Sequence, residues 1–138
     1  MSQFEQLIRL RTWELDEKRR AMGVLLQEEA GLLAEADAMQ LELDREKQAA
    51  AGSLEARRTL EAYMHHFKAR VHAQNERIEA KRREIDAANE EVLDSYQELC
   101  KAEAVLDEHN AREAERIGRL EQMEIDEIAL NMMKLRRG

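Results

Sequence analysis

The sequence lacks proline entirely and holds only five glycines and one cysteine, and aromatic residues make up 4% of its 138 positions. Proline and glycine mark turns and loops, so their scarcity excludes a fold built from many short elements. A globular core of this length would need more aromatic and β-branched residues. The lone cysteine, Cys100, excludes an intrachain disulfide and fits a reducing compartment.

Long apolar runs are also missing. No stretch approaches the roughly 18 apolar residues that a membrane span requires. The opening residues MSQFEQLIRL carry no apolar core of a signal peptide. The net charge of −8 argues against nucleic acid as a partner. We therefore expect a cytoplasmic protein with no direct membrane insertion and no nucleic-acid partner.

Charged residues account for 38% of the chain, and Ala and Leu supply much of the rest, as in long helices and coiled coils. Apolar residues recur in alternating steps of four and three from Phe4 to Ala50, and again from Met64 to Leu106. This spacing is the heptad pattern of a coiled-coil seam. The pattern predicts two long helices that pack against each other.

The only clear break between the two seams is Gly52 followed by Ser53. Gly suits the position after a helix, and Ser suits the cap before the next one. The sequence therefore predicts an all-α fold, in which two long helices form an antiparallel coiled-coil hairpin and the second helix is longer than the first. We expect a single domain over 1–138, with helices at 3–50 and 54–136 and a turn at 50–54.

The distribution of charge supports an antiparallel arrangement about Gly52. In that arrangement residue i lies near about residue 104 − i, so the basic stretch 57–83 faces the acidic stretch 21–47. The first helix then ends opposite about residue 101, which leaves about 35 residues without a partner in the chain. An amphipathic helix without an internal partner is usually a binding element.

That final segment is more apolar than a solvated helix should be. The thirteen residues before Gly138 are IDEIALNMMKLRR, whose apolar residues cover more than one helix face. The apolar stripe also shifts its register before this segment, because Leu106 and Ile117 are eleven residues apart, which locally unwinds a left-handed supercoil. We expect an exposed, adhesive tip.

No residue pattern points to catalysis. The four histidines lack the i, i+4 spacing of a helical zinc site, and a two-helix coil offers no pocket that would perturb its paired carboxylates. No basic cluster lies near Cys100 in sequence to activate its thiol. We therefore expect a protein that is not an enzyme, with no catalytic residues, no metal site and no cofactor.

Two aromatic residues have two interpretations each. Trp13 lies off the seam, where its ring either covers the aliphatic stems of Arg9 and Glu17 or contacts a partner, since Trp is enriched at binding hot spots. Tyr63 lies near the seam residues Met64 and Phe67 and serves either as packing or as an exposed anchor. The sequence leaves both choices open.

The segment FEQLIRLRTWELDEKRRAMGVLLQEEAGLLAE resembles the N-terminus of the flagellar type III export protein family FliJ. The ending RLEQMEIDEIALNMMKLRR is also similar to the ending of that family. The resemblance implies a coiled coil like the central stalk of rotary ATPases. It also implies two partners, the hexameric export ATPase FliI and the export gate protein FlhA, together with handling of export chaperones. The protein would then associate peripherally with the inner-membrane export apparatus.

By the same resemblance, the helix-terminal end enters the ATPase ring and the turn end faces the gate. The residues implied at the ATPase end are Phe4, Leu7, Ile8, Trp13, Ile125, Ile128, Met132 and Met133. Those implied at the gate end are Tyr63, Met64 and Phe67. Two alternatives remain at this point: the injectisome counterpart of the same stalk, and a coiled-coil scaffold that dimerises through its C-terminal overhang.

Overall fold

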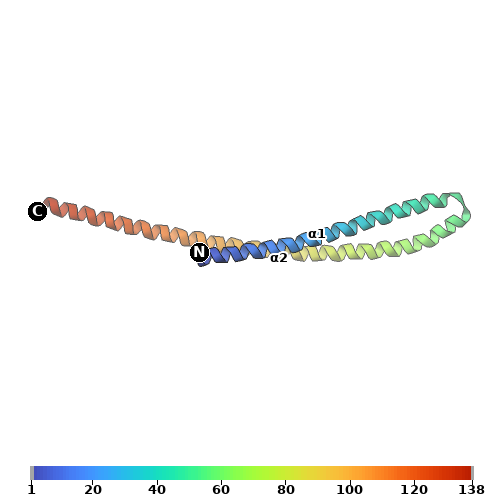
Figure 1. Ribbon diagram of the computed structural model, residues 1–138, viewed down its shortest axis with the longest axis horizontal. Helices are drawn as coiled ribbons and strands as arrows, with labels where there is room; N and C mark the ends of the chain where they lie inside the picture. Colours follow the sequence, from blue (N-terminus) through green and yellow to red (C-terminus); the bar gives the residue numbers. More distant parts are fainter. Residues whose placement is uncertain (1, 138) are drawn as a thin grey trace. The chain divides into compact units, whose positions relative to one another are not determined.

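The computed structural model of the protein describes residues 2–137 and contains two long helices. Helix α1 spans Gln3–Ala49, a short 3₁₀ turn η1 spans Ala50–Gly52, and helix α2 spans Leu54–Arg137. After the turn, α2 returns antiparallel to α1 (Figure 1). The predicted helical hairpin with a longer second helix is confirmed, and the helix ends lie within one residue of those expected.

Contacts divide the chain into two units, which we describe separately. One unit is Leu15–Ser95, which holds most of the hairpin and its turn. The other combines the chain up to Glu14 with the chain from Tyr96 onward. The first will be called the turn unit and the second the terminal unit. The prediction that 1–138 forms a single domain stays a prediction.

Serine residues cap the start of both helices. The Ser2 hydroxyl accepts a hydrogen bond from the Glu5 amide at 3.2 Å, and the Ser53 hydroxyl accepts one from the Ala56 amide at 3.0 Å. The expected role of Ser53 is therefore confirmed. Gly52 does not adopt the left-handed conformation that is typical of a glycine after a helix, because no described glycine has a positive φ. The end of α1 uses the 3₁₀ turn and an extended Ser53 instead of a left-handed glycine cap.

The predicted seam coincides with the protected positions of both helices. All thirteen seam positions from Met64 to Leu106 are buried or half-buried, whereas only Lys18 and Glu46 are exposed among the fourteen positions on the first helix. Among the described residues, six apolar residues are buried, each with at most 6% exposure, and they are Leu15, Leu43, Ala50, Phe67, Ile78 and Ala102. A core this thin makes each layer a large share of the stability.

Polar residues interrupt the seam of the turn unit and connect its helices. Gln74, only 2% exposed, donates hydrogen bonds to the Leu32 carbonyl at 2.8 Å and to the Glu35 carboxylate at 3.1 Å. Lys81 donates to Glu28 at 2.5 Å and to Glu84 at 2.9 Å, and these hydrogen bonds raise the pKa of its ammonium group. Such directional contacts specify one alignment of the two helices more sharply than apolar packing does.

Three further ion pairs cross between the helices of this unit: Lys18–Glu91, Arg70–Glu42 and Arg82–Glu29. The predicted pairing of basic with acidic stretches is thus present. The register, however, differs from the prediction, because the residue numbers of the cross-helix partners add to between 106 and 112 and not to 104. Each exposed pair contributes at most about 1 kcal/mol.

The turn explains this shift of about five residues. Ala50, which is buried, lines the same small hollow as Leu60. The first turn and a half of α2 is therefore part of the connection, and α2 comes level with the end of α1 only near Leu60. The predicted sum of partner residue numbers was too small because it treated Gly52 alone as the turn.

Neither helix, over residues 2–137, contains a window apolar enough to cross a membrane.

Candidate partner-binding surfaces

The terminal unit contains a helical segment that no other part of the unit covers. Every residue from 114 to 137 is exposed, and α2 continues there without a neighbouring helix (Figure 1). We call residues 114–137 the tail. The register correction shortens this segment, because the sequence predicted an unpartnered stretch beginning about residue 102. About two dozen residues remain uncovered, which is still some 36 Å of helix.

The tail displays apolar side chains on several faces. Nine large apolar residues are 47–82% exposed, and they are Ile117, Leu120, Met123, Ile125, Ile128, Leu130, Met132, Met133 and Leu135. At 100° per residue, these positions occupy well over half of the helix circumference. The tail can therefore contact partners on more than one side at once.

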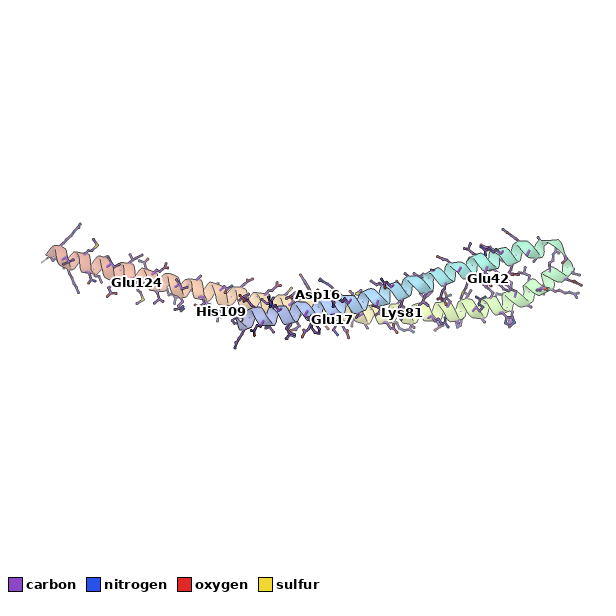
Figure 2. All side chains as sticks on the ribbon, viewed as in Figure 1. Asp16, Glu17, Glu42, Lys81, His109 and Glu124 are labelled. Carbon is purple, nitrogen blue, oxygen red and sulfur yellow. The ribbon has the colours of Figure 1, made fainter. Side chains whose placement is uncertain are left out.

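Near the C-terminal end of α2, acidic and basic residues occupy separate stretches of the helix. Arg112, Arg116 and Arg119 each pair with a glutamate three or four residues earlier on the same helix. Beyond them, an acidic band contains Glu121, Glu124, Asp126 and Glu127, and a basic tip contains Lys134, Arg136 and Arg137. Within the described residues, none of these seven charges forms an ion pair. Figure 2 shows Glu124 on this bare part of α2.

The covered part of α2 ends near the start of α1. The Phe4 ring lies against the His109 ring, with centroids 4.8 Å apart and planes inclined by 34° (Figure 2 labels His109). Glu113 is the last half-buried residue of the helix. A hydrogen bond from Arg116, its charge, and the nearby His109 lower the pKa of the Glu113 carboxyl. This cluster marks the boundary between paired helix and tail.

The expected ATPase-end residues fall into two separate places in the terminal unit. Phe4 and Ile8 are half-buried on the seam, while Leu7 and Trp13 are 37% and 60% exposed. Ile125 lies sixteen residues past the level of Phe4, which corresponds to about 24 Å along the helix. The eight residues therefore do not converge on one patch.

Trp13 has an exposed apolar neighbour that sequence reasoning did not single out. Leu10, 48% exposed, lies three residues before Trp13 and hence on the same face of α1. The i, i+3 spacing away from the seam was the available signal. The exposure of Trp13 favours the interpretation of this residue as a contact surface over that of a packed ring.

The expected gate-end residues lie together in the turn unit but are largely protected. Phe67 is 6% exposed, Met64 and Tyr63 are half-buried, and the Tyr63 and Phe67 rings stack with centroids 6.1 Å apart. Burial, followed by the negative charge of Glu42, raises the pKa of the Tyr63 phenol. The Tyr63 hydroxyl oxygen is buried with no hydrogen-bond partner of normal geometry among the described residues.

We searched residues 2–137 for a cluster of metal-binding side chains and for deep pockets. No group of three His, Cys, Asp or Glu residues there could hold a metal ion. The hollows on the surface are shallow grooves beside one or two helices, such as the one lined by Leu120, Met123, Glu127 and Leu130. The most extensive exposed apolar surface among the described residues is the tail.

The fold is a helical hairpin whose longer helix carries a bare, apolar extension, which places the protein in the class of long helical coiled-coil proteins. The chain belongs to the flagellar FliJ protein family, whose model matches residues 1–138. This membership places the protein in flagellar export and supports the resemblance drawn from its two ends. Comparisons with curated proteins and with solved structures give no significant match.

Proposed function

We propose that the protein is a central-stalk component of the flagellar export apparatus, whose tail enters the ring of the hexameric, FliI-like export ATPase. The observation that carries the proposal is the tail itself, with nine apolar side chains exposed and no helix from the same unit beside it. A single helix is about 10–12 Å wide, so it fits a pore that a helix pair would not. Apolar residues on several faces suit a site surrounded by similar subunits.

Methionine supports the same proposal. The tail holds Met123, Met132 and Met133, each more than half exposed. Unbranched, polarizable side chains of this kind adapt to partners of slightly different shape, as several subunits of a ring would present. Among the ATPase-end residues, Ile125, Ile128, Met132 and Met133 belong to the tail, whereas Leu7 and Trp13 offer a second contact at the start of α1.

The second partner in this proposal is the FlhA-like export gate, contacted near Tyr63, Met64 and Phe67. Because Phe67 is buried in the seam, its contribution is to hold the Tyr63 ring in place while Tyr63 and Met64 present their exposed edges. The protein would then work in the cytoplasm, peripherally associated with the inner-membrane export apparatus. Escorting export chaperones is part of the same proposal.

The test is stimulation of a purified hexameric export ATPase by the full chain. Ile128→Asp should abolish most of the stimulation, because it places a charge in the centre of the tail. Leu41→Asp is a matched control, since Leu41 and Ile128 are both 58% exposed but Leu41 lies in the turn unit. Equal stimulation by the two variants and the unchanged protein would contradict the proposal.

A further inference from the structure

We propose that two copies of this chain pair antiparallel through residues 124–136 of their tails. The pairing face is the row Ile125, Ile128, Met132 and Leu135, which are 59%, 58%, 59% and 82% exposed. Their steps along the helix are three, four and three residues, which is a coiled-coil seam on one face. These steps are the same when counted from either end. The rows of two antiparallel copies therefore align residue against residue.

An antiparallel partner brings specific residues together. With the two copies centred on residue 130, Ile125 of one copy lies opposite Leu135 of the other, and Ile128 lies opposite Met132. All four layers of the seam are then apolar on both sides. No other spacing of the exposed tail residues gives an uninterrupted apolar row of this length.

Charge complementarity selects the antiparallel direction. The acidic half of the segment, with Glu124 and Asp126, then faces the basic half of the other copy, with Lys134 and Arg136. Glu124 borders one side of the seam, with Lys134 farther out on the same side, whereas Arg136 borders the other side, with Asp126 farther out. A parallel pair would instead set acid against acid and base against base, which is unfavourable. None of these four residues has an ion pair within the described chain.

The structure leaves room for this partner. The pairing segment begins eleven residues after Glu113, where the cover provided by α1 ends. About thirteen residues, or roughly 20 Å of helix, take part in each copy. Two heptads form a small interface, so the dimer should be reversible and sensitive to salt. Because it covers Ile128 and Met132, it competes with any other partner of that face, but the pairing does not rest on the proposed function.

Sedimentation equilibrium of the full chain at low salt tests the pairing. The unchanged protein should dimerise, and Lys134→Glu with Arg136→Glu should weaken the dimer about tenfold or more, because basic tips no longer meet acidic bands. Adding Glu124→Lys and Asp126→Lys should restore it, since the reversed charges again match. Arg57→Glu with Arg58→Glu makes the same change of net charge outside the tail and should have no effect.

Disulfide trapping tests the direction independently. In a Cys100→Ala background, chains carrying Ile128→Cys and chains carrying Met132→Cys should cross-link when mixed, and each kind alone should not. A parallel pair would cross-link each kind with itself, which overturns the proposal. A wholly monomeric unchanged protein at the highest attainable concentration overturns it as well. Either result leaves the ATPase test of the proposed function unaffected.

Discussion

The side-chain amide of Gln74, on α2, donates a 2.8 Å hydrogen bond to the backbone carbonyl oxygen of Leu32, on α1. The same nitrogen lies 3.1 Å from the Glu35 carboxylate, so one buried group fastens the two helices of the turn unit. Both partners are acceptors, so a polar side chain at position 74 is accommodated only if it supplies a donor.

Replacing Gln74 with Glu should destabilise the turn unit strongly. The side chain keeps its shape but loses both donors, and a carboxylate then faces another carboxylate and a carbonyl at a position that is 2% exposed. We expect a loss of about 2–4 kcal/mol in urea unfolding at neutral pH. Gln74→Leu should stay within about 1 kcal/mol of the unchanged protein, because the Leu32 carbonyl lies within helix α1 and the exposed Glu35 carboxylate can be hydrated. Equal stability of the two variants would refute this account.

The thin seam predicts that truncating a buried leucine lowers the free energy of unfolding far more than truncating an exposed one. Leu15 is 3% exposed and Leu41 is 58% exposed. Leu15→Ala should cost about 2–5 kcal/mol, because it removes contacts and leaves a cavity. Leu41→Ala should change the free energy of unfolding by less than about 0.5 kcal/mol. Chemical denaturation followed by circular dichroism measures both, and similar losses would mean that the seam is assigned to the wrong face.

Helix α1 contains glycines whose replacement by alanine should stabilise the protein. A Cβ atom built at Gly31 meets nothing within 4 Å, and the residue has no positive φ. Gly31→Ala should therefore stabilise the folded chain by about 1 kcal/mol, since Ala favours the helix and restricts the unfolded state. A melting temperature that falls would show that Gly31 contacts something at that face. Gly52→Ala, in the turn, should give a smaller gain.

Tyr63 should ionise only at unusually high pH. Burial of the hydroxyl and the charge of Glu42 raise its pKa above the ordinary 10.0. The folded state then holds its proton longer than the unfolded state, so this contribution to stability is complete below pH 10 and is lost as pH rises through the folded pKa. Ultraviolet absorbance of a Tyr96→Phe variant isolates the titration. Glu42→Gln should lower the pKa only in part, because burial is the larger cause.

Heptad spacing predicted the fold closely because it reports which side of each helix is apolar, and the protected side follows from that alone. The same steps of four and three from Met64 pass through Gln74 and Lys81, and both of these polar residues are protected in the structure. The register was wrong by about five residues, because the path of the chain around Ala50–Leu60 depends on three-dimensional geometry that spacing does not encode. Spacing also does not reveal the buried contacts that specify the alignment, such as the hydrogen bond from Gln74 to the Leu32 carbonyl.

The candidate surfaces were predictable to a lesser degree. The surplus apolar residues of the tail were visible in the sequence, since no seam needs both Ile128 and Leu130. Exposure was not predictable for Trp13 and Tyr63, because an aromatic residue beside a seam can fold inward or outward at similar cost. Leu10 was missed because its significance depends on the exposure of its neighbour Trp13.

Because every residue of the tail is exposed and none packs against another helix among residues 2–137, its helix is held by its own backbone and by pairs such as Glu115–Arg119. Such pairs add about 0.2–0.5 kcal/mol each. Its amide hydrogens should therefore exchange with solvent far faster than those around Ile78, at a rate set by local helix opening. Any molecule that covers the tail must slow this exchange. The exchange rate of each tail amide therefore reports whether a partner covers that residue, even in a mixture that contains the other components of the export apparatus.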